Sequence, residues 1–298
     1  MNEEILEFDF IGELLDPRAV VYLAMILAVF YFAKRSFEWF APYSLNHQLT
    51  EADNKAVALT FSGYLFGVGL VLLSVLKGEE YGSEGGSRAV VYLTEMGITV
   101  GWCLGGIALL HLARTINDKI MLHKFNNVKE IIEDRNLGTA AVECGCYIGS
   151  GLIIHASLVG ESTGFVDGVL STLVFFAIGQ LLFILFGVMY QRVTRFDVHE
   201  QIEQDNTAAG VSAGMNLVAI GVLLSGYIQF SDSLPGLAVW FALASLLLLT
   251  SRYMVDKFML PGQLLDEEIM NDRNWGAAFV EGTTAIVFAF IINACFLS

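Results

Sequence analysis

Two glutamates lie inside long apolar stretches of the chain, where a carboxylate is unexpected. Glu143 and Glu281 each follow an asparagine, Asn136 and Asn274, by seven residues. In membrane-spanning helices both carboxylates would lie about 10 Å from the end of the span. An ionisable side chain at that depth costs about 2.5–3.5 kcal/mol on insertion scales and usually marks an ion or proton pathway. The bland alternative is a protonated glutamic acid that hydrogen-bonds a neighbouring helix.

Further polar residues follow the same pattern. His155 and Asn293 each come twelve residues after these glutamates, in Ile-Ile-His-Ala and Ile-Ile-Asn-Ala. A packed or interfacial histidine is a better expectation for His155 than a proton relay. Glu95 has Ser233 at the equivalent place and is expected near the outer membrane surface, where a carboxylate is less costly.

A short motif precedes four of the apolar stretches. The four copies are Asp53-Asn54, Asp134-Arg135-Asn136, Asp205-Asn206 and Asp272-Arg273-Asn274. Asp and Asn are the preferred N-caps, because their side-chain oxygens accept hydrogen bonds from unpaired N–H groups of the first helical turn. Capping therefore explains the residue types. The rival interpretation places all four pairs around a cytoplasmic vestibule that binds a cation or a partner.

The sequence shows little metal or enzyme chemistry. His47 and Glu51, like His199 and Glu203, stand one helical turn apart. Two ligands on one face are weak evidence for a metal, so an amphipathic turn on the membrane surface is favoured and metal binding stays unknown. The chain has no metalloprotease, nucleophile-elbow or phosphate-loop signature. We therefore predict no enzyme activity, no catalytic residue and no cofactor.

Composition explains why these polar residues stand out. The 298 residues are 55% hydrophobic and 16% charged, with a net charge of −15. Soluble domains carry about 25% charged residues. The low charge and the mean hydropathy of +0.61 predict a multi-pass membrane protein whose main partner is the lipid bilayer. The acidic balance argues against nucleic acid as a partner.

Eight apolar segments are long enough to cross about 30 Å of hydrocarbon. They cover residues 18–37, 56–77, 89–113, 139–159, 166–190, 208–230, 234–251 and 276–297. Glycines recur four residues apart at Gly63/Gly67, Gly101/Gly105, Gly145/Gly149 and Gly210/Gly214. This spacing lets helices approach closely in lipid. We expect packing within the chain, and at one or two of these sites a homo-oligomeric contact.

Basic residues sort to one side of the predicted membrane. Thirteen of the sixteen Lys and Arg residues fall on the side of the four Asp-Asn motifs, and three on the other. Short cytoplasmic loops are rich in such residues. The motifs are therefore predicted to be cytoplasmic, and both termini, including an acidic tail at 1–17, to lie outside.

The chain is internally duplicated. Residues 118–156 match 256–294 without gaps at 17 of 39 positions, an offset of 138, and Arg114 pairs with Arg252 at the same offset. A second match, at offset 152, relates residues 47–72 to 199–224. We predict an all-α integral membrane protein in which two four-helix repeats, 18–160 and 161–298, run in the same direction. The motifs suggest a smaller two-helix unit used four times.

The four Asp-Asn motifs, each before a glycine-rich span, resemble the YjfL-like bacterial inner-membrane family, a domain of unknown function that occurs in tandem copies. The resemblance covers about residues 18 to 298, although two copies of the motif carry one inserted residue. It implies a multi-pass inner-membrane protein, and the distribution of basic residues then predicts that both termini are periplasmic. It implies no substrate, but it associates the chain with flotillin-like and other membrane-stress partners.

Two functions remain open on this sequence. One is a transporter or channel for protons or a small cation that uses Glu143 and Glu281. The other is a non-transporting membrane partner, or scaffold, in envelope maintenance or stress response. A polar cavity at the glutamates would favour the first function, and apolar packing around them the second.

Overall fold

The computed structural model describes residues 17–76, 88–122, 126–159, 164–260 and 262–297. In these ranges eight helices are long and apolar enough to cross a membrane. They are α2 (Pro17–Phe40), α4 (Lys55–Leu76), α5 (Arg88–Ile120), α7 (Leu137–Val159), α8 (Phe165–Val193), α10 (Thr207–Phe230), α11 (Leu234–Met254) and α13 (Trp275–Phe296). The all-α fold with eight spans is confirmed. The acidic tail lies outside the described residues, apart from Pro17.

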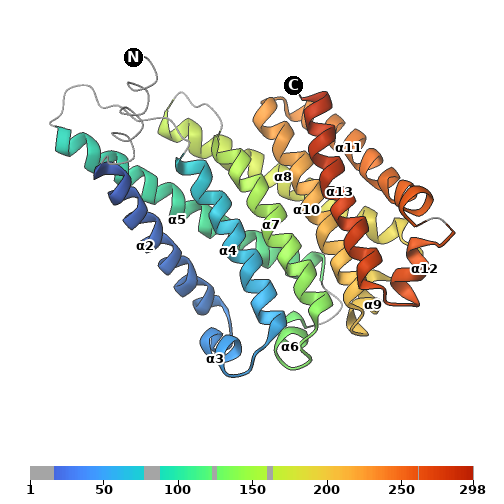
Figure 1. Cartoon of the computed structure of the whole chain (residues 1–298). Coiled ribbons are helices and arrows are strands. Elements are labelled where there is room, and N and C mark those ends of the chain that lie inside the picture. The colour runs from blue at the N-terminus through green and yellow to red at the C-terminus, as the bar shows by residue number, and fades with distance from the viewer. Residues whose placement is uncertain (1–16, 77–87, 123–125, 160–163, 261, 298) are drawn as a thin grey trace, which may run out of the picture.

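Short helices alternate with the long ones. They are α3 (Leu45–Thr50), α6 (Asn127–Ile132), α9 (Val198–Glu203) and α12 (Leu265–Met270), and a π-helical turn, Val255–Met259, extends α11. The short helices lie at one end of the molecule, each just before one of α4, α7, α10 and α13 (Figure 1). The repeating unit is therefore a long helix, a short helix and a second long helix, used four times.

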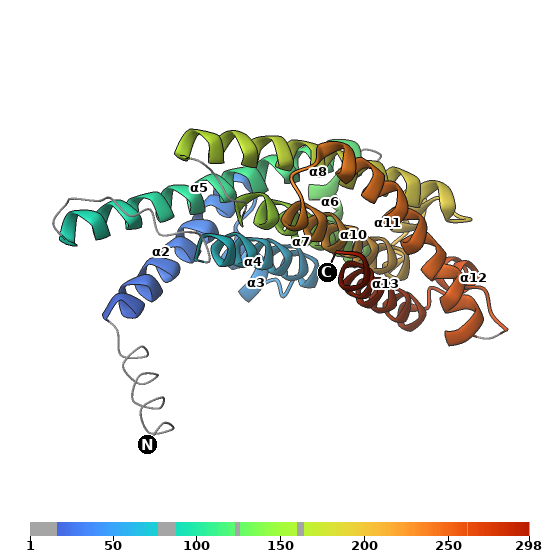
Figure 2. The ribbon, with the colours of Figure 1, turned by 90° about the horizontal axis from the view of Figure 1, so that it is seen from above.

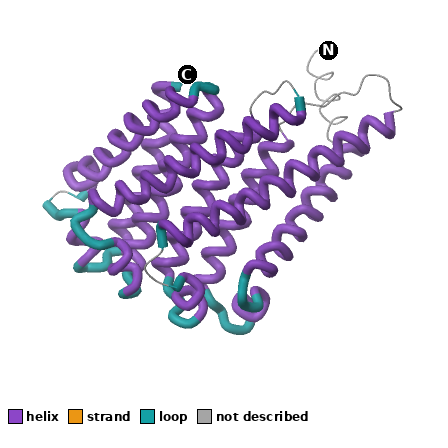
Figure 3. Tube along the Cα trace, turned by 180° about the vertical axis from the view of Figure 1, so that it is seen from behind, coloured by secondary structure: helices purple, strands orange, loops and turns teal. Residues whose placement is uncertain are grey.

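The second long helices of these units form a continuous row in the order α4, α7, α10, α13 (Figures 1 and 2). All four run in the same direction, as parallel repeats require. The first long helices cover one face of the row: α5 packs on α4 and α7, α8 on α7 and α10, and α11 on α10 and α13. The described chain, seen from behind in Figure 3, consists of helices and loops.

Glycines let the helices of the row approach closely. A Cβ atom on Gly151 of α7 would lie 2.8 Å from the Cα atom of Gly67 in α4, and one on Gly221 of α10 would lie 2.7 Å from the Cα atom of Gly149. Small residues permit such backbone contact in lipid. The glycine pair at 101 and 105 differs, because no atom lies within 4 Å of a Cβ built at either position.

Candidate functional site

Glu281 of α13 is fully buried and well bonded. Only 1% of its surface is exposed. Ser212 Oγ donates to Oε2 over 2.5 Å, and Asn216 Nδ2 donates to Oε1 over 2.8 Å, both from α10. Arg252 Nη1 of α11 lies 3.4 Å from Oε1. Both carboxylate oxygens of Glu281 are therefore satisfied by groups on two neighbouring helices.

Arg252 connects Glu281 to the short helix α12 and to Tyr190 of α8. Its Nη2 contacts Asp266 Oδ1 of α12 at 2.7 Å, and its Nη1 donates to the Tyr190 hydroxyl at 2.5 Å. The guanidinium also lies over the Tyr190 ring, 5.1 Å from the centroid. Tyr190 and Ser212 share a hydrogen bond of 2.6 Å. We call Tyr190, Ser212, Asn216, Arg252, Asp266 and Glu281 the Glu281 cluster.

Glu143 of α7 occupies the equivalent place and is 3% exposed, but neither of its carboxylate oxygens has a hydrogen-bond partner. Three other buried polar atoms of this region also lack partners: Thr60 Oγ1, Arg114 Nη1 and Tyr147 Oη. Buried polar groups are almost always paired. So many unpaired groups around one carboxylate indicate a site that is completed by a proton, a water molecule or an ion.

A small cavity lies beside Glu143. It has a volume of about 10 Å³ and is lined by Leu110, Arg114, Asn117, Asp118, Glu143, Cys146, Tyr147 and Ser150. This is near the smallest volume that holds one water molecule. Arg114 Nε lies 3.5 Å from Asp118 Oδ2. We call these lining residues, together with Thr60, the Glu143 cluster.

Hydrogen bonds extend the Glu143 cluster from α4, α5 and α7 to a fourth helix, α8. Asn117 Nδ2 of α5 donates to Ser150 Oγ at 3.2 Å, and Gln180 Nε2 of α8 donates to Asn117 Oδ1 at 2.7 Å. Gln180 is buried, and its own side-chain oxygen has no partner. Beyond the end of α2, burial, with a smaller contribution from nearby Glu143, raises the pKa of Tyr43 to about 12. Polar groups thus surround Glu143 from several elements.

The arginines of both clusters lie near the ends of long helices, since α5 continues to Ile120 and α11 to Met254. Both guanidinium groups contact carboxylates of the helix layer: Arg114 contacts Asp118, and Arg252 contacts Glu281. The sequence signal for this shared role is that Arg114 and Arg252 pair at the offset that also relates Glu143 to Glu281. Without these two arginines, eleven basic residues, against three, lie on the side of the motifs.

The Asp-Asn motifs act as helix caps. The side-chain oxygens of Asn54, Asn136, Asn206 and Asn274 accept from N–H groups in the first turn of the following helix, at 3.0–3.3 Å. The residue just before each of these asparagines has a positive φ: Asp53, Arg135, Asp205 and Arg273. The inserted arginine of two copies therefore takes the same backbone position as the aspartate of the other two. The motifs lie along a row (Figure 1), not around a vestibule.

Three of these asparagines also join successive units. Asn54 Nδ2 donates to the carbonyl of Ile131 in α6 at 2.9 Å. Asn136 donates to Ile202 in α9 at 2.6 Å, and Asn206 to Ile269 in α12 at 2.8 Å. We call this contact the asparagine bridge. Each asparagine amide also bonds the fourth residue of its own short helix, namely Gln48, Glu130, Gln201 or Glu268.

The remaining candidate residues have structural contacts. His155 Nδ1 lies 3.1 Å from the Leu70 carbonyl, and Asn293 Nδ2 donates to the Val222 carbonyl at 2.8 Å. Leu70 and Val222 are equivalent at offset 152. Both side chains therefore join their helix to the preceding helix of the row. Glu95 is half-buried in α5.

Each histidine of the two His-Glu motifs has a contact within the protein. His47 Nε2 lies 3.7 Å from Glu51 Oε2, with both side chains exposed, and His199 Nε2 bonds the Met121 carbonyl. Within the described ranges no group of three or more His, Cys, Asp or Glu side chains is placed to hold a metal ion.

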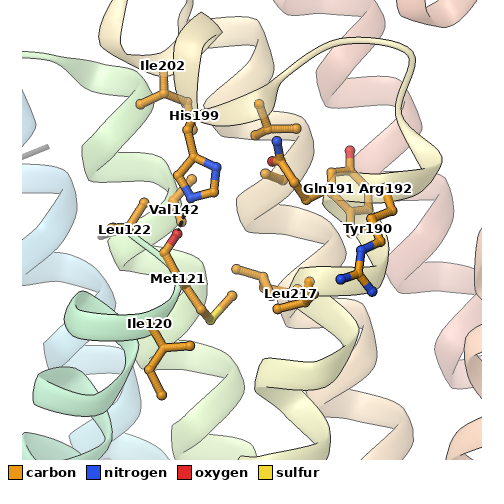
Figure 4. A pocket seen from close by; sticks show the side chains of 14 residues that line it. Ile120, Met121, Leu122, Val142, Tyr190, Gln191, Arg192, His199, Ile202 and Leu217 are labelled. Atoms are coloured by element: carbon orange, nitrogen blue, oxygen red, sulfur yellow. Dashed lines mark hydrogen bonds between the residues drawn. The ribbon is translucent and has the colours of Figure 1, made fainter. Parts of the chain in front are cut away.

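A larger pocket lies between the two clusters. It has a volume of about 270 Å³ and is lined by residues such as Met121, Val142, Tyr190, His199 and Leu217 (Figure 4). Val142 precedes Glu143 in the chain, and Tyr190 belongs to the Glu281 cluster. Most of its lining is apolar, so the pocket separates the two clusters rather than joining them through water.

The fold and these clusters define an all-α, multi-pass membrane protein built from tandem units. A family model described as "Domain of Unknown Function (DUF350)" matches residues 9–158 and again 164–296, so the chain belongs to this family. The family description is broader than the YjfL-like resemblance, which stays a prediction.

Two relatives have names that agree with a membrane location. A "UPF0719 transmembrane protein" from Aquifex aeolicus (strain VF5) is 24% identical over 278 residues, covering 90% of this chain and 97% of the relative. The "UPF0719 transmembrane protein YshE" from Bacillus subtilis (strain 168) is 25% identical over 120 residues, covering 40% of this chain and 88% of the relative. YshE thus has about the length of one matched domain. No solved structure matches the chain.

Proposed function

We propose that the protein is a proton-linked transporter or channel and that Glu143 is its proton-binding group. One observation carries this proposal: Glu143 is buried beside a small cavity, and neither of its carboxylate oxygens has a hydrogen-bond partner. A buried carboxylate without partners costs several kcal/mol when it is ionised. Protonation of Glu143 removes this cost, and release of the proton restores it. The site is therefore suited to couple protonation to a conformational change.

The cavity favours a proton over a metal cation. Its volume of about 10 Å³ leaves room for about one water molecule. Arg114 contributes a positive charge to the same cavity, and Asp118 compensates it at 3.5 Å. A metal ion needs more ligands and is repelled by the arginine. A proton needs one acceptor oxygen and one donor or water molecule beside it, and both oxygens of Glu143 can accept.

The two glutamates are assigned different roles. Glu281 is bonded by Ser212, Asn216 and Arg252, so removal of its charge disturbs three contacts. This arrangement supports a structural role in which Glu281 fixes α10, α11 and α13 relative to one another. From the sequence, both glutamates were expected to share one function. We now propose that function for Glu143 alone.

We further propose a bacterial inner-membrane location, with cytoplasmic Asp-Asn motifs and periplasmic termini. The eleven-to-three distribution of basic residues supports this orientation. Arg135 is exposed in the turn before α7 and gives a suitable labelling position. An Arg135→Cys variant in intact spheroplasts should react with an impermeant maleimide only after the membrane is opened. Labelling from outside would reverse the orientation.

Proton flux into proteoliposomes tests the function directly. Purified protein is reconstituted with a pH-sensitive dye inside, and a potassium gradient with valinomycin drives the protons. The chain should carry protons, Glu143→Gln should abolish the flux, and Glu281→Gln is the matched control at the equivalent position and should retain it if it folds. Absence of flux from the unaltered protein would remove the transport proposal. The scaffold function, with a flotillin-like or other membrane-stress partner, would then be favoured.

A further inference from the structure

The asparagine bridge stops at the last unit of the row. Asn54, Asn136 and Asn206 each donate to a carbonyl of the next short helix. Asn274 caps α13 and bonds Glu268 of its own unit in the same way, but no short helix follows α13 among the described residues. At the other end of the row, the equivalent carbonyl belongs to Leu49, the fifth residue of α3, and the described residues contain no earlier unit of the row.

The outer edge of α13 repeats a pattern that is buried elsewhere. Within the row, α7 packs on α10 through Gly138, Val142, Gly145, Gly149, Ile153 and Ala156. At offset 138 these residues correspond to Gly276, Val280, Thr283, Val287, Ile291 and Ala294, which are exposed along one edge of α13. Four of the six pairs are identical. The exposed edge of α13 therefore retains much of the surface with which α7 packs on α10.

The outer edge of α4 matches the surface on which α7 packs. In α10 that surface contains Gly210, Gly214, Leu217 and Gly221. At offset 152 the corresponding residues of α4 are Ala58, Ser62, Leu65 and Gly69. Ser62 is exposed, and no atom lies within 4 Å of a Cβ built on Gly69. The edge is lined mostly by small residues, which allow close helix contact in lipid.

The covering layer is incomplete at the same end. Helices α5, α8 and α11 each lie across two neighbouring helices of the row. Helix α2 packs on α4 and α5 but has no earlier helix of the row beside it. Large side chains such as Leu23, Leu27 and Tyr31 are 57–68% exposed on α2, as are side chains on the lipid-facing surfaces of the other spans. A preceding helix of the row would bring α2 into the position that the other covering helices have.

We infer that these edges bind one another between two copies of the chain, with α13 of one copy beside α4 of the next. The new interface continues the α7–α10 interface within the chain, and Asn274 donates to the Leu49 carbonyl of the next copy. The one-domain length of YshE fits this inference, because a chain of that length can make the equivalent of the α7–α10 interface only with another chain. Such a head-to-tail contact gives a ring if it closes and a filament if it does not.

Engineered cysteines test the predicted register. Gly145 and Gly214 are in contact inside the chain, and their equivalents at the free edges are Thr283 and Ser62. A Ser62→Cys, Thr283→Cys variant is made in a Cys295→Ser background and oxidised in native membranes with copper phenanthroline. We expect a ladder of disulfide-linked dimers and larger species, because the two cysteines of one copy lie at opposite ends of its row.

The controls separate this interface from random collision. Each single variant should remain monomeric on a denaturing gel. The same result is expected for Ser62→Cys combined with Leu246→Cys, because the Leu246 side chain is exposed on α11, away from the proposed interface. The unaltered protein in nanodiscs should show a mass of two or more chains by native mass spectrometry. A single-chain mass for the unaltered protein would overturn the inference. So would a double variant that crosslinks no more than the Leu246 control. Neither outcome affects the proposed role of Glu143.

Discussion

The Glu143 and Glu281 clusters occupy equivalent places in two halves of one chain, yet they bind their carboxylates differently. At offset 152, Ser212 and Asn216 of the Glu281 cluster correspond to Thr60 and Tyr64. Arg252 lies over the Tyr190 ring and bonds its hydroxyl, whereas Arg114 lies over the ring of Phe37, which has no hydroxyl, 5.5 Å from its centroid.

The change from Asn216 to Tyr64 has the larger consequence. Asn216 donates to Glu281, but the Tyr64 hydroxyl donates instead to the Ala33 carbonyl at 3.0 Å and lies 2.9 Å from Ser36 Oγ. Both halves have the buried carboxylate, but only the second half has side chains, Ser212 and Asn216, that donate hydrogen bonds to it. Duplication thus preserved one glutamate in a structural network and left the other with free acceptor oxygens.

The largest expected difference in stability is between the variants in which one or the other glutamate is replaced with leucine. Glu281→Leu removes the acceptor of Ser212 and Asn216 and one of the carboxylates beside Arg252. Breaking a buried ion pair in this way costs about 3–5 kcal/mol. Glu143→Leu breaks no hydrogen bond of normal geometry, but it removes the interactions of Glu143 with Thr60 and Arg114, so its loss of stability should be clearly smaller. Thermal unfolding in detergent measures both. Equal losses in the two variants would show that the clusters are bonded alike.

A smaller difference is expected between two capping asparagines. Asn206 is fully buried and combines its cap with an asparagine bridge, whereas Asn274 is exposed and bonds only its own unit. Loss of a cap costs about 1 kcal/mol, and a buried unsatisfied carbonyl adds about 1–3 kcal/mol. Asn206→Ala should therefore lower the unfolding temperature clearly more than Asn274→Ala. This comparison is made on monomers in detergent, so that contacts between copies do not contribute.

Much of this fold could be predicted from the sequence, because hydropathy alone defines a membrane helix. The eight predicted segments and the parallel duplication agree with the structure. The Asp-Asn motifs were recognisable as caps, because residue type and position determine capping directly. The asparagine bridge was not predictable, since it depends on how one unit packs against the next.

The site was predictable only in part. Repetition at a fixed offset singled out Glu143 and Glu281, but the apolar segments ended before Arg114 and Arg252, so hydropathy did not connect these arginines with the glutamates. Arginine has a strong penalty on insertion scales, and such scales do not include the carboxylates that compensate it. The different bonding of the two glutamates depends on residues of α2 and α4 that are 79 or more positions away from Glu143. Those contacts exist only in the folded chain.

The smallest expected effect concerns Glu130 of α6, which lies outside the spans. Burial raises the pKa of Glu130, and Asn136 donates to its Oε2 at 2.9 Å. The folded state therefore holds the proton more tightly than the unfolded state, and stability is lost as the pH rises through the folded-state pKa. Gln201 makes the same contact with Asn206 at 2.7 Å. Glu130→Gln should keep the bond and remove this loss.

The stability gain from Glu130→Gln should stay below about 1 kcal/mol, as hydrogen bonds near a surface contribute little net energy. Unfolding temperatures of both proteins at several pH values between about 4 and 7 measure it. The difference in favour of the glutamine variant should grow with pH. A difference that is constant or shrinks with pH would contradict the assignment.

Infrared difference spectroscopy tests the central claim most directly, because it detects protonated carboxyl groups in the membrane-embedded protein. Spectra are recorded across a pH titration for the unaltered chain, Glu143→Gln and Glu281→Gln, with hydrogen–deuterium exchange to assign the carboxyl band. The account predicts a titrating carboxyl band that disappears in Glu143→Gln and persists in Glu281→Gln. A band that persists in Glu143→Gln, or that depends on Glu281 instead, would contradict it.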